Sequence, residues 1–68
     1  MALLQKLRDQ TSKTQEQVAA ELEIHVRTVI RHETGETRLR PMHRTMYANY
    51  FGVTPDSIEQ PERDEVAA

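Results

Sequence analysis

An arginine follows an aliphatic residue twice near the middle of the chain, in the pairs Val26-Arg27 and Ile30-Arg31. Residues four apart share one face of a helix, so a helical segment would display the two arginines together. The surrounding region is basic, because residues 25–44 contain five arginines against two glutamates, a local charge of +3. A field of this sign attracts phosphate groups, although a solvated charged face is the commoner origin of such a stretch.

The rest of the composition limits what the chain can be. It has 68 residues, enough for one small domain, and its net charge of -2 argues against a general polyanion binder. There is no cysteine, which excludes disulfides and cysteine zinc sites and fits a reducing cytoplasm. No apolar run approaches the roughly 18 residues that span a bilayer, and the first ten residues lack the apolar stretch of a signal peptide.

Two short helices are expected before the arginines. The first lies within residues 2–10 and has leucines on one side: Leu3, Leu4 and Leu7. The second begins with Thr14 and Gln17, whose Thr-x-x-Gln spacing predicts a capping box, and it ends near Glu23. Its buried stripe is formed by Val18, Ala19 and Leu22.

The third helix begins about two residues later and carries the arginine pairs. It covers about residues 25–34, with Ile24 and Val29 facing the core. Gly35 is suited to the left-handed conformation that ends a helix. Residues 35–40 have no useful period and predict a loop.

A fourth helix is expected from Pro41, a residue favoured in the first turn, to Gly52. Its apolar stripe consists of Tyr47, Ala48 and Phe51. Thr54 and Pro55 predict the cap and first position of a further helix, from which Ile58 can turn inward. With no β-strand pattern, the prediction is an all-α domain over residues 1–60.

The last residues differ from the domain in composition. Residues 59–68 carry four acidic side chains against one arginine, which gives a local charge of -3. Residues 61–68 are too polar and too few to bury a face, so they predict a flexible acidic tail.

The spacing of the second and third helices is the most informative feature. Two helices of roughly eight to ten residues joined by a turn of three or four residues cross steeply, which is the helix-turn-helix geometry. From about Leu4 to Ile58 the chain resembles the Cro/repressor type of helix-turn-helix domain, often called XRE-like. The motifs that carry the resemblance, in order, are LQKLRDQ, TQEQVAAEL, VRTVIRHETGE and YANYFGVTPDSI.

The resemblance implies a compact bundle of about five short helices, similar to the lambda repressor, with double-stranded DNA as the partner. The third helix would enter the major groove, while the second would lie across the backbone. The implied base-contacting residues are Val26, Arg27, Ile30 and Arg31. An arginine fork can take guanine O6 and N7, and aliphatic side chains can touch thymine methyl groups. The implied backbone or mixed contacts are Gln15, His25, Thr28, Arg38, Arg40 and Arg44.

Each implied contact has an alternative. Arg27 and Arg31 could touch phosphate or be merely solvated, because most protein–DNA hydrogen bonds go to the backbone. Val26 and Ile30 could pack in the core after a small rotation of the helix. Gln15 could be an ordinary first-turn residue, and the arginines of the loop and fourth helix could be simply exposed.

Arg8 and Glu33 match a pair that forms a buried salt bridge in relatives, so their expected role is structural. Four residues depart from the family pattern. Glu23 stands where the family has a glycine in the turn, and His25 stands where it has a Ser or Thr cap. His32 and Lys13 occupy positions that are normally apolar. His32 could be a neutral, hydrogen-bonded core residue, an exposed ring or a pH-sensitive element. It is not expected to bind a metal, because no ligand set at the right spacing surrounds it.

The function expected from the sequence is sequence-specific transcriptional regulation. Catalysis is not expected, because the chain is small for a substrate pocket and contains no Gly-rich phosphate loop or nucleophile elbow. No cofactor is expected, and the sequence does not identify an effector. A homodimer on two half-sites is expected, or else the chain is a fragment without its dimerisation domain. Tyr50 and the fifth helix are a candidate interface, but no sequence feature fixes it. The alternative function is a helical protein-interaction module or an antitoxin-type protein whose main partner is another protein.

Overall fold

The structure is a computed structural model that describes residues 2–60, so the acidic tail expected over residues 61–68 lies outside the described residues. The elements in chain order are β1 (Ala2–Leu3), α1 (Leu4–Gln10), α2 (Gln15–Leu22), α3 (Val26–Thr34), α4 (Pro41–Phe51), a 3-10 turn (Pro55–Ser57) and β2 (Ile58–Glu59).

The starts of three helices follow from local signals. Thr14 Oγ1 accepts a hydrogen bond from Gln17 N at 3.0 Å, and Gln17 Oε1 accepts one from Thr14 N at 2.8 Å, which confirms the capping box. Before α3, His25 Nδ1 accepts from Arg27 N at 3.1 Å, so a histidine performs the capping role. Pro41 is in the first turn of α4, as predicted.

Three of the helices, α2, α3 and α4, end at left-handed residues. Glu23 has φ 58° after α2, where its side chain must tolerate a conformation that favours glycine. Gly35 after α3 and Gly52 after α4 have φ 80° and 72°, which confirms both expected helix ends. These three residues set the directions in which the chain leaves its helices.

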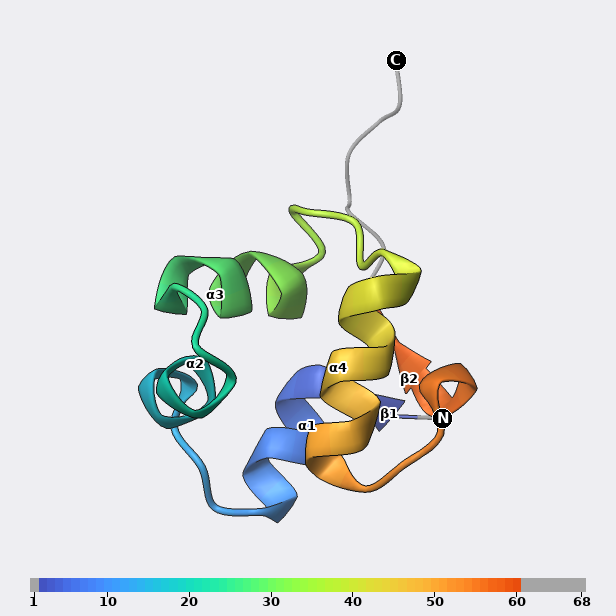
Figure 1. Cartoon of the computed structure of the whole chain (residues 1–68), viewed down its shortest axis with the longest axis horizontal. Helices are drawn as coiled ribbons and strands as arrows, with labels where there is room; N and C mark the ends of the chain where they lie inside the picture. Colours follow the sequence, from blue (N-terminus) through green and yellow to red (C-terminus); the bar gives the residue numbers. More distant parts are fainter. Residues whose placement is uncertain (1, 61–68) are drawn as a thin grey trace.

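The helices are arranged so that α3 lies at one end of the molecule. Figure 1 shows α2 nearly end-on while α3 runs across the view, so their axes cross steeply. On the other side of the molecule, α4 passes close to α1, and the two strands lie beside each other. The chain therefore presents α2 and α3 together as one corner.

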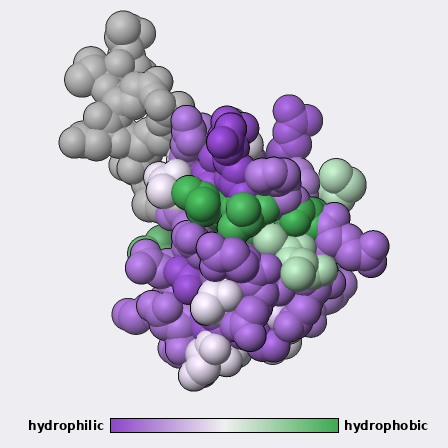
Figure 2. Space-filling view, turned by 90° about the vertical axis from the view of Figure 1, so that its left-hand side faces the viewer, coloured by the Kyte–Doolittle hydropathy of each residue, from purple (hydrophilic) through white to green (hydrophobic). Residues whose placement is uncertain are grey.

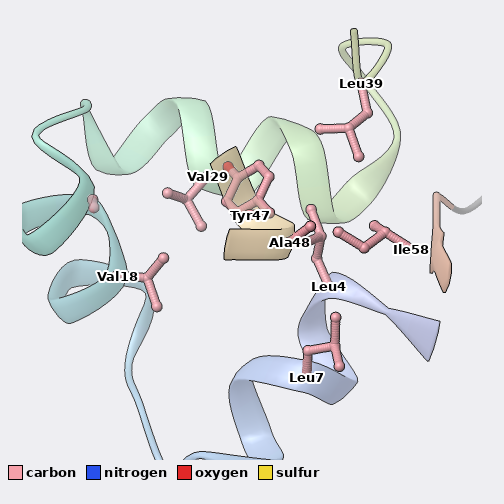
Figure 3. Close-up of a cluster of buried hydrophobic side chains, with 9 residues drawn as sticks. Leu4, Leu7, Val18, Val29, Leu39, Tyr47, Ala48 and Ile58 are labelled. Carbon is pink, nitrogen blue, oxygen red and sulfur yellow. The ribbon is translucent and has the colours of Figure 1, made fainter. Parts of the chain in front are cut away.

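A single apolar core holds these elements together. Figure 3 shows its side chains converging from the helices and from β2. The buried apolar residues are Leu4, Leu7, Val18, Ala19, Val29, Leu39, Tyr47, Ala48 and Ile58. Ile24 and Phe51 are partly buried and pack against this cluster. Most of the predicted stripes are therefore buried, as expected for the inner faces of amphipathic helices.

Two expectations about the fold were wrong. The chain contains strands: Ala2 pairs with Ile58 and Leu3 with Glu59 in a short parallel ladder. The expected fifth helix is only a 3-10 turn, after which Ile58 enters β2 with its side chain fully buried. Strands of two residues are too short to show an alternating pattern. The paired residues are also more than fifty positions apart in the sequence, so no local pattern predicted the strands.

Burial also differs from expectation at two leucines. Leu3 belongs to β1 and is 39% exposed, although Leu4 and Leu7 beside it are buried as predicted. Leu39, in the region predicted as an ordinary loop, is 4% exposed and belongs to the core. Leu39 N donates to Gln60 Oε1 at 2.8 Å, so a distant contact fixes this loop residue.

Candidate nucleic-acid interface

The corner between α2 and α3 forms a helix-turn-helix. The helices have 8 and 9 residues, and the turn consists of Glu23, Ile24 and His25. Its backbone is hydrogen-bonded to α2, with Ile24 N donating to Ala19 O at 2.9 Å. Partly buried Ile24 packs on the core and holds the turn against the domain. The steep crossing predicted from the spacing is therefore built by local contacts.

The exposed face of α3 brings together four residues that were expected near DNA. His25, Arg27, Thr28 and Arg31 line one open hollow of about 360 Å³. Both arginines are exposed, and they lie four residues apart on the helix. The hollow is therefore a cationic, solvent-accessible surface with a ring nitrogen and a hydroxyl near its edge.

His25 has a definite role in this surface. Its Nδ1 accepts the hydrogen bond from Arg27 N, so the neutral ring carries its proton on Nε2. The capping bond fixes the ring at the start of α3, where the helix dipole is positive. A neutral His25 can therefore offer one N–H donor at the edge of the hollow.

The two aliphatic residues of this face differ in exposure. Ile30 is 38% exposed, whereas Val26 is partly buried and packs against the core. Val29 and His32 are buried on the inner side of α3, as expected. The inward packing of Val26 leaves Ile30 as the more accessible aliphatic side chain for contact with another molecule.

An ion pair joins α1 to the end of α3. Arg8 Nε donates to Glu33 Oε2 at 2.6 Å, and Arg8 Nη2 donates to Glu33 Oε1 at 3.1 Å. The side chains are 13% and 6% exposed, which makes this pair part of the fold. The hydrogen bond with Glu33, the largest influence, raises the pKa of Arg8. Such a pair orients α3 relative to α1.

Gln15 adds a third member to this pair. Its Nε2 donates to Glu33 Oε1 at 2.9 Å, and the side chain is only half-buried. The structure therefore gives Gln15 an internal partner that the sequence did not predict. The contact fixes the amide at the start of α2, the helix expected to cross the DNA backbone.

The remaining arginines do not form one set. Arg38 and Arg40 are exposed on the loop between α3 and α4. Arg44 is half-buried, and its Nη1 donates to the carbonyl oxygen of Ile58 in β2. Arg44 therefore has a structural partner within the domain, and its expected contact with phosphate stays a prediction. The sequence could not reveal this contact, because the partner of Arg44 lies in a strand that the sequence did not predict.

A polar cluster lies beneath the α3 surface. His32 Nδ1 lies 2.7 Å from the Tyr47 hydroxyl oxygen, and the His32 and His43 ring centroids are 4.9 Å apart. His32 is 1% exposed, so the core alternative for this residue is the one observed. Burial and, to a lesser extent, His43 lower the pKa of His32. Burial also raises the pKa of Tyr47 above its usual range. Burial therefore favours the neutral forms of His32 and Tyr47.

Sequence reasoning missed the partner of Arg31. Arg31 Nε lies 3.6 Å from Glu36 Oε2, and both side chains are roughly half exposed. Glu36 follows Gly35, beyond the end of α3, so helical periodicity gave no signal for this contact. Lys13 occupies a position that is apolar in the family pattern. Its side chain forms an ion pair with Glu21, with Nζ 3.0 Å from Oε2.

An apolar band crosses this side of the molecule. Figure 2 shows it over α2 and α3 on an otherwise hydrophilic face. The apolar residues of the corner are Leu22, Ile24, Val26 and Ile30. The interface therefore combines cationic side chains with aliphatic ones. No helix within residues 2–60 is long and apolar enough to cross a membrane.

Comparison with known proteins agrees with this geometry. A family model described as helix-turn-helix matches residues 4–58, which include all four α-helices of the described chain. No curated protein and no solved structure gives a significant match. The matched residues begin and end where the Cro/repressor resemblance begins and ends. The chain therefore belongs to the helix-turn-helix family of DNA-binding regulators, of the Cro/repressor (XRE-like) type.

Proposed function

We propose that this protein is a sequence-specific transcriptional regulator of repressor type that places α3 in the major groove of DNA. The observation that carries the proposal is the joint exposure of Arg27 and Arg31 on α3, where both line one open hollow. Both can present the donor fork that matches guanine O6 and N7. Occupation of an operator in this way would block or recruit polymerase.

The other contacts follow from this orientation. Ile30 would touch a thymine methyl group, and the exposed part of Val26 would contribute less because it packs on the core. Thr28 and the His25 N–H would face phosphate or a base edge. Arg38 and Arg40 are exposed on the adjoining loop and would contact phosphate. Gln15 would contact the DNA backbone from the position in which its hydrogen bond with Glu33 holds its side chain.

A homodimer is part of the proposal. One domain of this size contacts little DNA, and useful specificity comes from two copies on half-sites about one helical turn apart. The Tyr50 hydroxyl donates to Glu21 Oε1 at 2.5 Å within the chain, so this hydroxyl already has a partner. We therefore propose the dimer without assigning its interface to Tyr50. No cofactor or catalytic step is proposed, and the site of action is the cytoplasmic nucleoid.

Selection of random duplex DNA on the purified protein tests the proposal. The selection would be run at about 0.15 M salt, an ionic strength that screens weak nonspecific attraction. We expect recovery of a motif that contains guanine and thymine, and a palindrome would indicate a dimer. Recovery of random sequence, with no enriched base at any position, would reject sequence-specific binding.

A protein partner is the second candidate, and the apolar band over α2 and α3 favours it. The two functions differ in their dependence on salt. Binding to DNA weakens steeply as salt rises because counterions are released, whereas docking through aliphatic side chains does not. An antitoxin-type protein would combine both behaviours. It would select a DNA motif and also bind a protein partner with little dependence on salt.

A further inference from the structure

The pairing of Arg31 with Glu36 distinguishes Arg31 from Arg27. Arg31 Nε lies 3.6 Å from Glu36 Oε2, so the carboxylate approaches the inner edge of the guanidinium. Within residues 2–60, none of the ion pairs includes Arg27. The two arginines of the candidate interface are therefore held differently, although both are exposed.

Backbone contacts fix the position of Glu36. Gly35 turns the chain at φ 80°, and Thr37 N then donates to Arg31 O at 3.3 Å, which returns the chain to the last turn of α3. Glu36 N donates to Thr34 Oγ1 at 3.4 Å. The carboxylate therefore projects from a turn that is tied to the same helix as Arg31.

The side chain of Gln60, which is distant in the sequence, holds this turn in place. Its Nε2 donates to the carbonyl oxygens of His32 and Thr37, and its Oε1 accepts from Leu39 N at 2.8 Å. One amide side chain thus joins the end of α3 to the loop on both sides of Arg38. Because Thr37 directly follows Glu36, the clamp limits how far the carboxylate can move from Arg31.

The geometry leaves the outer donors of Arg31 available. A guanidinium has five N–H donors, and contact at Nε does not use the two terminal nitrogens that address guanine end-on. We propose that Glu36 is a positioning residue that orients the Arg31 guanidinium toward a base and sharpens its preference for guanine. This inference rests on the proposed function, because it assumes that Arg31 reads a base.

The charge of Glu36 has a second consequence. A carboxylate beside the interface repels phosphate, so it weakens attraction to DNA of every sequence. Glu36 also disfavours a contact between Arg31 and phosphate, because the guanidinium would have to move away from Glu36 to reach the phosphate. Glu36 therefore lowers general affinity while raising discrimination, and its removal should change the two quantities in opposite directions.

The test compares Glu36→Gln with the wild-type protein on the selected DNA motif and on duplexes that carry each single base change. Dissociation constants would be measured by fluorescence anisotropy at fixed salt, together with the melting temperature. Arg31→Ala identifies the base pair that Arg31 reads. Glu23→Gln is the matched control, because it removes an exposed carboxylate from the turn at the other end of α3.

We expect Glu36→Gln to reduce discrimination at the Arg31 base pair by about threefold to tenfold, which lies in the lower part of the range measured for residues in contact. Affinity for mismatched DNA should rise, and the melting temperature should remain nearly unchanged. Glu23→Gln should leave the discrimination intact. In an Arg31→Ala background, Glu36→Gln should have no further effect on discrimination.

Two results would overturn the inference, and they have different meanings. If Arg31→Ala removes a base preference but Glu36→Gln does not weaken it, Glu36 does not position Arg31 and the proposed function stands. If the wild-type protein shows no base preference that depends on Arg31, the proposed base contact is wrong and the inference about Glu36 is wrong with it.

Discussion

At the scale of single residues, His32 has the most unusual surroundings in the domain. It lies on the inner side of α3, against Tyr47 and His43 of α4. No described protein group is in hydrogen-bond range of His32 Nε2 or His43 Nδ1, and both atoms are buried. Because an unpaired buried polar group costs about 1–3 kcal/mol, this cluster limits the stability of the fold.

The first prediction concerns the pH dependence of that stability. Burial, followed by His43, lowers the pKa of folded His32, so the unfolded chain binds more protons just below pH 6.5. The free energy of unfolding should therefore fall as the pH falls below about 6.5, until the pKa of the folded state is passed. Urea unfolding at several pH values between about 7.5 and 5 measures this free energy. The range brackets the usual histidine pKa of about 6.5.

Two variants identify the responsible histidine. His32→Leu should flatten the change in stability between these pH values, even if it alters the stability itself. His25→Asn keeps a residue that can cap α3 but removes the histidine whose Nδ1 accepts from Arg27 N, so it separates the contribution of that cap from the contribution of His32. An unchanged slope in His32→Leu would show that another group controls the titration.

At the scale of elements, the sequence predicted what is determined within a few residues. The Thr14 capping box, the left-handed Gly35 and the Pro41 start of α4 all depend on backbone groups no more than one helical turn away. The strand ladder, the burial of Leu39 and the role of Gln60 depend on contacts between distant segments. No local period specifies such contacts, so these features could not be predicted.

The second prediction concerns the left-handed residue in the helix-turn-helix corner. Glu23→Gly should raise the free energy of unfolding by up to about 1 kcal/mol, because glycine adopts φ 58° without the steric cost of a side chain. Thermal and urea unfolding would measure the change. Ala20→Gly, inside α2, should have the opposite effect and cost about 1 kcal/mol. A Glu23→Gly protein less stable than the wild type would reject this account of the turn.

The third prediction concerns the element that closes the domain. Arg44→Ala should lower the free energy of unfolding by about 1–2 kcal/mol, because the carbonyl of Ile58 in β2 loses a charged donor. Arg38→Ala, on the exposed loop, should change stability by no more than about 0.5 kcal/mol. Urea unfolding of both variants provides the comparison. Equal stabilities would mean that Arg44 does not hold the strand.

At the scale of the whole molecule, the distribution of charge over the surface matters more for binding to DNA than the net charge does. The net charge is -2, yet α3 and the following loop display Arg27, Arg31, Arg38 and Arg40. The sequence predicted this surface because helical spacing placed Arg27 and Arg31 on one face. It did not predict the internal partners of Gln15, Arg31 and Arg44, because those contacts depend on tertiary packing.

The central claim is that α3 reads bases while the loop contacts phosphate, and these two roles have different signatures in binding. Removal of a base contact lowers the preference for one sequence, whereas removal of a phosphate contact weakens all sequences and reduces the dependence on salt. Arg31 and Arg38 provide a matched pair, because both are exposed arginines on neighbouring segments.

The most direct measurement is the affinity of wild type, Arg31→Ala and Arg38→Ala for the selected motif and for a scrambled duplex, over a range of salt. Arg31→Ala should weaken binding to the motif by about 1–3 kcal/mol and remove the preference at one base pair. Arg38→Ala should weaken binding to both duplexes similarly and reduce the salt slope by about one. Equal losses on both duplexes for both variants would contradict base reading by α3.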